Sequence, residues 1–273
     1  MSALVFRLKA APRQRVDLSP LTPDGLHGLA IADIVRVSLA SGNQRLAVGE
    51  LFEVTAGDAT DIVIHGSCER LDGIGTGLSA GSITVEGDAG AYLGRGLRGG
   101  RVHVTGNAGP WAAAQMHGGT LQIEGSAGNC VGGALPGEMH GMNGGLVVVR
   151  GNAGDRAGDR MRRGLIAIGG DAGAYAGSRM IAGTVLVLGQ SVGAYPGFNM
   201  KRGTLLMRAR PARMLPTFAD AGAHDFGFLR LLAHAFGSES TYARELAQLG
   251  TRVRKYVGDA ANAGKGEILL WSA

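Results

Sequence analysis

A glycine motif of fixed length recurs along the middle of the chain, and it constrains the fold more than any other feature. The unit reads Gly-x-Ala-Gly-x-x-x-Gly and is followed, after a gap, by glycine and an alternating apolar run. Its fourth position falls at 90, 109, 128, 154, 173 and, in a drifted copy, 193. The spacings are 19, 19, 26, 19 and 20 residues, and the long interval is one period plus seven residues inserted within 133–143. A fixed period of this length indicates a solenoid of stacked coils.

Each unit ends in a short segment that is typical of a β-strand. The outer two residues of every triplet are apolar, and alternation along a strand places them on one face. The triplets are 62–64, 83–85, 102–104, 121–123, 147–149, 166–168, 185–187 and 205–207. A unit of about 19 residues is too short for two helices, and its glycines would weaken any helix. We therefore predict an all-β chain that forms a right-handed parallel β-helix, because parallel crossovers are almost always right-handed.

The eleventh position of the unit forms a second column of long apolar residues. It reads Leu97, Met116, Met142, Met161, Met180 and Met200. A long apolar side chain at one phase of every coil predicts a column that stacks in the core. Methionine suits an irregular corner because its side chain is flexible.

The segments on either side of the repeats differ from them in pattern. Residues 1–58 are predicted to form a small N-terminal cap, in which 34–37 and 46–48 resemble a hairpin across Ser41-Gly42-Asn43. Residues 59–208 form the β-helix in this interpretation. Residues 209–273 form a partly helical C-terminal tail, with helical spacing at 226–232 and 242–247, that packs on the solenoid.

The middle residue of each triplet is predicted to point away from the core. This outer column begins with Thr84, His103 and Gln122, which are polar, and continues with residues that are apolar: Val148, Ala167, Leu186 and Leu206. An apolar stripe of this length should not face water. It is covered either by the C-terminal tail or by another protein of a complex, and we take Val148, Leu186 and Leu206 as candidate interface residues.

Arginine residues gather where the coils turn toward the strands. Arg160, Arg162 and Arg163 are the densest group, and they are candidates for contact with an acidic partner or an anionic ligand. The alternative is that these charges are solvated and simply blunt the edges of the solenoid. The net charge of the chain is +5, but no nucleic-acid-binding motif accompanies it, so we do not predict nucleic acid as a partner.

Two short motifs match active-site patterns without their structural context. Residues 94–99 satisfy G-x-G-x-x-G and residues 77–81 satisfy G-x-S-x-G, but both patterns need a helix to follow, and none is predicted. His117 and His140 fall in neighbouring coils without metal-ligand spacing. We therefore predict no catalytic, cofactor-binding or metal-binding residue in this chain.

The remaining composition points to a protein of the cytoplasm. Cys68 and Cys130 are too few for a disulfide scaffold and are predicted to be buried thiols in a reducing compartment. No apolar run approaches the roughly 20 residues that a membrane helix needs. We therefore expect a cytoplasmic protein with no membrane partner.

The coil motif at 87–94 and 170–177 resembles the glycine-repeat domain at the C-terminus of the large chains of glutamate synthase. The flanking segments are similar to those of the C subunit of formylmethanofuran dehydrogenase at residues 49–54, 215–218, 256–259 and 264–269. This second resemblance covers essentially the whole chain, so the flanks narrow the assignment to this C-subunit family.

That resemblance implies a role in a multi-subunit enzyme of one-carbon metabolism. A protein of this family occurs in archaeal molybdenum or tungsten dehydrogenases and in the bacterial formyltransferase/hydrolase complex of formaldehyde oxidation in methylotrophs. The bacterial complex moves a formyl group from tetrahydromethanopterin to a methanofuran-type carrier and hydrolyses it to formate. The arginine-rich, lysine-poor composition favours the bacterial complex.

The resemblance also implies which components of the complex carry the chemistry. The hydrolase-like A subunit holds the metal ions, the formyltransferase D subunit transfers the formyl group, and the C subunit is a non-catalytic scaffold without a cofactor. The implied partners are the A, B and D subunits and a polyanionic methanofuran-type carrier. Two alternatives stay open, a dehydrogenase component and a free-standing structural or carbohydrate-acting β-helix, although the outer column lacks the carboxylates that acid–base chemistry requires.

Overall fold

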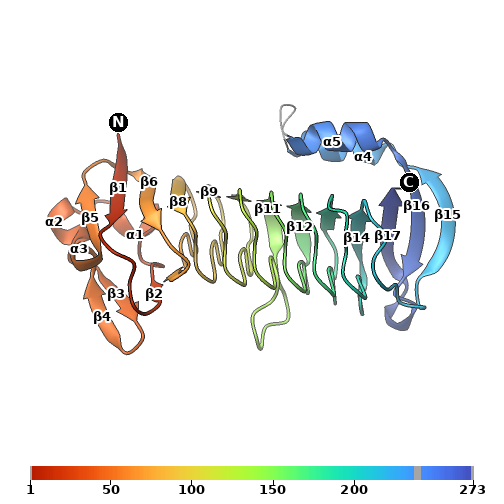
Figure 1. Ribbon diagram of the computed structural model, residues 1–273, viewed down its shortest axis with the longest axis horizontal. Coiled ribbons are helices and arrows are strands. Elements are labelled where there is room, and N and C mark those ends of the chain that lie inside the picture. The colour runs from red at the N-terminus through yellow and green to blue at the C-terminus, as the bar shows by residue number, and fades with distance from the viewer. Residues whose placement is uncertain (1, 237–240, 272–273) are drawn as a thin grey trace.

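One large sheet runs along the whole molecule (Figure 1). The structure is a computed structural model that describes residues 2–236 and 241–271. The sheet has thirteen strands, and all its strands from β1 to β17 in spatial order are parallel. These parallel strands are β1 (Ala3–Leu8), β6 (Asp58–Ser67), β8 (Ser82–Gly87), β9 (Arg101–Val104), β10 (Thr120–Ile123), β11 (Asn143–Val149), β12 (Arg163–Ile168), β13 (Thr184–Val187), β14 (Arg202–Met207) and β17 (Lys265–Trp271).

Successive coils form β-bridges at two fixed phases, and further backbone hydrogen bonds join their turns. The strands pair in constant register, so that Thr84 lies beside His103 and Val148 beside Ala167. On the opposite side of each coil, the motif alanines form parallel bridges from Ala89 to Ala172. Figure 1 shows the resulting stack of coils along the long axis. All the predicted strand triplets lie inside strands, and the prediction of a mostly β chain is confirmed.

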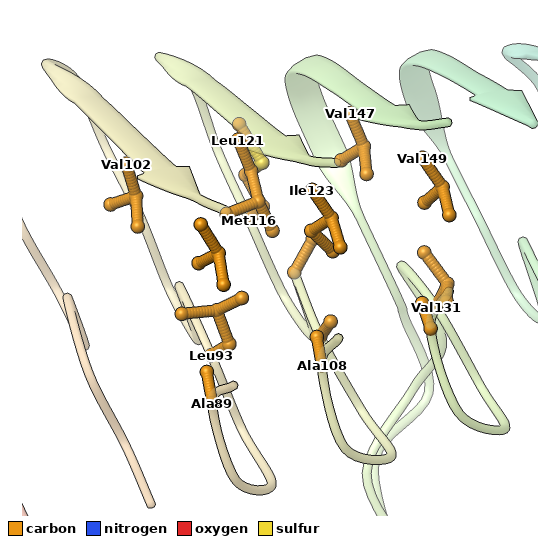
Figure 2. Packing of buried hydrophobic residues seen from close by; sticks show 14 of the residues in the cluster. Ala89, Leu93, Val102, Ala108, Met116, Leu121, Ile123, Val131, Val147 and Val149 are labelled. Carbon is orange, nitrogen blue, oxygen red and sulfur yellow. The ribbon is translucent and has the colours of Figure 1, made fainter. Parts of the chain in front are cut away.

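The core lies inside the stack, between the strands and the alanine bridges. Figure 2 shows side chains of the strand triplets, such as Val102 and Leu121, pointing toward Ala89 and Ala108 on the opposite wall. The predicted column at the eleventh position is fully buried from Leu97 to Met200. Full burial of one such side chain stabilises the fold by about 1.5–3 kcal/mol. The prediction of a stacked methionine column is therefore confirmed.

Gly177 lies where a coil turns against the core, and a larger residue does not fit there. Gly177 has φ +65°, and a Cβ there would lie 2.4 Å from Cδ2 of Leu205 in the next coil. A larger residue would clash with the buried strand and strain the backbone at once.

The second position of the glycine motif carries a ladder of hydrogen bonds. The backbone N–H of Asn107 donates to Oδ1 of Asp88 at 2.7 Å, and the N–H of Ser126 donates to Oδ1 of Asn107 at 2.9 Å. The same bond recurs from Asn152 to Ser126 and from Asp171 to Asn152, at 3.1 and 2.8 Å. Each small polar side chain thus binds the backbone of the following coil.

The N-terminal residues fold into a small second sheet with short helices. The elements are β2 (Val16–Asp17), α1 (Pro23–Leu26), α2 (Ile31–Ile34), β3 (Ser38–Ser41), β4 (Gln44–Ala47), α3 (Val48–Leu51), β5 (Phe52–Thr55) and β7 (Leu71–Asp72). The hairpin across residues 42–43 is confirmed. The prediction of a strand at 34–37 is wrong, because Ile34 ends the helical turn α2 and is buried by it. The large sheet also reaches into this region, since β1 pairs with β6.

The C-terminal residues both extend the sheet and fold back over it. Their elements before β17 are β15 (Ala219–Asp225), α4 (Phe228–His234), α5 (Thr241–Leu249), β16 (Arg252–Gly258) and the 3-10 turn η1 (Ala260–Asn262). The predicted helical segments correspond to α4 and α5. Strand β17 pairs with β14 as the next parallel strand, and β16 and β15 follow it antiparallel. The tail is therefore part of the sheet as well as a cover for it.

Candidate docking surfaces

The apolar residues of the outer column lie side by side on neighbouring strands, as predicted. Most of them are buried within the chain and do not reach its surface. Ala167, Leu186 and Leu206 are fully buried, and they form a second apolar cluster with the C-terminal segment. That cluster includes Leu229, Tyr242, Leu246, Val253, Leu269 and Trp271. Figure 1 shows α4 and α5 lying over this part of the sheet. We call these two helices the arm.

The apolar part of the outer column was expected to be covered either by the C-terminal tail or by another protein, and the position of the arm supports the tail. Leu186 and Leu206 cannot contact a partner protein while the arm covers them. Their proposed role as interface residues is therefore corrected, because the chain buries this stripe against its own tail. Only Val148 stays half-buried, at the border of the covered region.

Buried polar contacts help to hold the arm on the sheet. The hydroxyl of Tyr242 donates to the carbonyl oxygen of Val149 at 2.5 Å, and burial raises the pKa of Tyr242. Nε1 of Trp271 donates to the carbonyl oxygen of Gly250 at 3.1 Å. The phenol of Tyr242 also stacks on Phe236, with ring centroids 5.3 Å apart. These contacts favour one position of the arm on the outer face.

Val148 borders a cavity of about 300 Å³ at the edge of the arm. Its lining includes Arg101, Gln122, Arg150 and Phe236. Beyond it the outer face is polar. There Glu124 accepts from His103 at 3.1 Å and from Arg150 at 2.5 Å. The polar residues at the beginning of the outer column, such as His103 and Gln122, thus lie beside charged side chains. They do not require another segment to shield them from water.

The three candidate arginines, Arg160, Arg162 and Arg163, differ in their surroundings. Arg162 and Arg163 are exposed at the start of β12. Arg160 is half-buried with φ +54°, and its Nη1 lies 3.4 Å from the carbonyl oxygen of Glu138. Only Arg160 lines a groove, so the structure separates it from the other two. Contact of these arginines with an acidic partner or anionic ligand stays a prediction.

The groove beside Arg160 lies between the inserted residues and the neighbouring coils. Its volume is about 220 Å³, and its lining includes Trp111, Cys130, Leu135 and Arg156. Cys130 is a free, half-buried thiol, and burial raises its pKa. Trp111 and Arg156 are not among the residues predicted from the sequence. The available signal was the sixth position of the glycine unit, which carries bulky side chains in several coils.

The histidines of this region are separate and exposed. His117 and His140 both face solvent. Within residues 2–236 and 241–271, no group of three or more His, Cys, Asp or Glu side chains could hold a metal ion. In the same ranges, no helix has the length and apolar character needed to cross a bilayer.

The C subunit of a formyltransferase/hydrolase complex is similar to this chain over nearly its full length. The C subunit of the formyltransferase/hydrolase complex Fhc from Methylorubrum extorquens is 49% identical over 265 residues, which cover 97% of this chain and 98% of that protein. The C subunit of a tungsten-containing formylmethanofuran dehydrogenase 2 from Methanococcus maripaludis is 29% identical over 95 residues, 34% of this chain. No family model matches the chain.

A solved structure is similar to this chain in fold as well as in sequence. A chain in the crystal structure of the formyltransferase/hydrolase complex (FhcABCD) from Methylorubrum extorquens, in complex with methylofuran, aligns with a TM-score of 0.90. The alignment has 42% identity and covers 98% of this chain and 100% of that chain. By the identity and the coverage of both comparisons, the chain belongs to the C-subunit family of the formyltransferase/hydrolase complex.

Proposed function

We propose that this chain is the scaffold component of a formyltransferase/hydrolase complex. The complex would convert formyl-tetrahydromethanopterin to formate through a methanofuran-type carrier. The observation that carries this proposal is the 49% identity with the M. extorquens protein, which extends over 97% of the chain. The similar solved chain belongs to a complex that contains methylofuran.

A scaffold role is supported by what the polar side chains do. The small polar residues of the glycine motif are used in the ladder from Asp88 to Asp171. Asp159, which is buried, accepts from Arg179 at 2.6 Å and from Ser178 at 2.5 Å. These groups hold neighbouring coils together, as is expected of a rigid scaffold. In this proposal the A, B and D subunits are the partners, and the metal ions belong to the hydrolase-like A subunit.

The strand order supports the type of solenoid that we propose for this scaffold. Consecutive strands that are parallel and in constant register support the right-handed parallel β-helix that the repeat predicts. The cytoplasmic location stays part of the proposal.

The dehydrogenase alternative is less well supported. The proteins from tungsten-containing and molybdenum-containing dehydrogenases match only 34% of this chain, at 29% identity in Methanococcus maripaludis and 34% in Methanosarcina barkeri. The matched part is about as long as a few coils, whereas the M. extorquens match includes both non-repeat ends. The higher identity over nearly the whole chain therefore favours the formyltransferase/hydrolase complex.

Affinity purification of the tagged chain from its own cells tests the proposal. We expect the A, B and D subunits to co-purify, and the complex to release formate from formyl-tetrahydromethanopterin. We expect the isolated chain to show neither transferase nor hydrolase turnover. Co-purification of a molybdopterin-bearing protein would select the dehydrogenase, and turnover by the isolated chain would refute a scaffold role.

A further inference from the structure

The sixth position of the glycine unit places aromatic residues in a backbone conformation that suits glycine better. Tyr92, Trp111, Tyr175 and Tyr195 have φ values of 63°, 59°, 61° and 60°. Bulky side chains are uncommon in this left-handed region. Cys130 and Arg156, at the sixth position of the other two coils, have φ values of 63° and 61°, so the repeat itself sets this conformation, and four of the six coils place an aromatic ring on it.

The aromatic column is a packed and partly exposed surface. Tyr92 stacks on Trp111 with ring centroids 5.7 Å apart, and Tyr175 packs against Tyr195 and Phe198 at 5.8 Å each. The guanidinium of Arg156 lies 5.5 Å from the centroid of the Tyr175 ring. Trp, Tyr and Arg are the residues most enriched at the energetic centres of protein interfaces.

The largest departure from the repeat period lies beside this column. The seven extra residues within 133–143 form a loop that projects from the stack (Figure 1). The loop and the coils enclose the groove of about 220 Å³ that Trp111 and Arg156 line. Insertions in repeat proteins often mark the binding face. The aromatic column and the insertion thus meet on one surface, at the groove that Trp111 lines.

Exposed apolar side chains also gather there. Met139 on the loop is 66% exposed, and its sulfur lies 3.4 Å from Nη1 of Arg160. Phe198 is 44% exposed and contacts the Tyr175 ring. These are two of the five large apolar side chains that stand exposed in the described part of the chain. We call the surface formed by Trp111, Met139, Arg156, Tyr175 and Phe198 the insertion corner.

The groove carries more positive than negative charge. Its lining includes Arg156, Arg160 and Arg179, against the two carboxylates Asp159 and Glu138. Asp159 is 4% exposed and is already paired with Arg179. Arg156 and Arg160 form no ion pair with any described residue of the chain. A carboxylate that enters the groove would meet two guanidinium groups, which bind carboxylates strongly.

We propose that the insertion corner is the surface on which this chain docks another protein of its complex, and that this partner places an Asp or Glu side chain in the groove against Arg156 and Arg160. The aromatic rings and Met139 supply the apolar contact, and the groove supplies the charge complementarity. This proposal rests on the proposed function for the existence of the A, B and D subunits, but it makes a separate claim about where they bind.

Substitutions that suit the backbone test the docking surface in the reconstituted complex. Trp111→Asn and Arg156→Asn keep a residue that tolerates positive φ, so each coil should be retained. We expect each variant to weaken the binding of the A, B and D subunits at least about tenfold, which is typical of a central interface residue. The thermal midpoint of the isolated chain should change by less than about 4 °C. Leu231→Asn, at a residue 71% exposed on the arm, is the matched control and should leave the affinity unchanged.

A footprint on the native groove avoids substitutions at the corner. In a Cys68→Ser background, Cys130 is the one thiol left for N-ethylmaleimide. We expect the complex to react at Cys130 at least about tenfold more slowly than the isolated chain, at the same pH. Equal rates in a complex that has assembled would overturn the docking proposal and leave the proposed function standing. Unchanged affinity in both corner variants, or an equal loss in Leu231→Asn, would also overturn it. If the wild-type chain binds none of the three partners, the proposed function fails.

Discussion

At the scale of single residues, the structure gives each position of the glycine unit a distinct task. The alanines form bridges between coils, the methionines fill the corner of the core, and the second position binds the next backbone. The sequence made the first two tasks predictable in part, because apolar residues at one phase indicate a buried column. The hydrogen-bond ladder was not predictable, because small polar residues are also typical of exposed turns.

Replacement of Asn107 tests the ladder. In Asn107→Ala the backbone N–H of Ser126 loses its acceptor, and we expect a loss of about 1 kcal/mol in the free energy of unfolding. Asn107→Ser is the matched control, because Ser126 makes the same bond one coil later. Urea unfolding of both variants measures the difference. Equal stability of the alanine and serine variants would mean that the hydrogen bond from the backbone to this side chain does not contribute to the free energy of unfolding.

Asp24 provides a test that depends on pH. It accepts from Oγ of Ser79 at 2.6 Å and from the Ser79 backbone N–H at 2.8 Å, and these bonds lower the pKa of Asp24. A lowered folded-state pKa stabilises the fold above the unfolded pKa of about 4, and the contribution is lost as the pH falls through the folded value.

We therefore expect Asp24→Asn to be less stable than the wild type at neutral pH, with the gap closing as the pH falls below the unfolded pKa of about 4 and through the lowered folded-state pKa of Asp24. Thermal unfolding of both proteins across a pH series measures this gap. Asp33→Asn is the control for a general charge effect, since the carboxylate of Asp33 is exposed on α2 and accepts no hydrogen bond from a described residue. A gap that is constant with pH would assign the effect of Asp24 to something other than its ionised carboxylate.

At the scale of elements, the polarity of the outer column matches the extent of the arm. Thr84, His103 and Gln122 lie on the uncovered half of the sheet, whereas Ala167 and Leu186 lie beneath the arm. The sequence therefore indicated that something covers the apolar half. It did not indicate what covers it, because an apolar stripe looks the same whether its partner is in the same chain or in another.

Leu186→Asp tests the cover directly. It would bury a carboxylate without a partner beneath the arm, and we expect a loss of about 3 kcal/mol or more in the free energy of unfolding. Hydrogen exchange should become faster in α4 and α5. Leu231→Asp, on the exposed side of the same arm, should change the stability by less than about 0.5 kcal/mol. If Leu186→Asp leaves stability unchanged but releases a partner protein, the column is a partner contact after all.

At the scale of the whole molecule, prediction succeeded where the repeat governs and failed where it does not. The strands between Ile62 and Met207 were predictable because each contacts only its neighbours at a fixed phase. The helix at Ile31–Ile34 was missed because a single helical turn has no periodic signal. The groove beside Trp111 was missed because it depends on where a non-repeating loop lies in space.

Both ends of the parallel stack are closed by antiparallel strands. At one end β5 pairs antiparallel with β1, and at the other β16 and β15 follow β17. The edges of the sheet are therefore the antiparallel strands β5 and β15, and no repeat coil lies at an edge. The stack therefore has a set number of coils and a set length. Each coil advances it by about 4.8 Å, the usual spacing between strands. The distance between any two surfaces of the stack is therefore fixed by the number of coils that separate them.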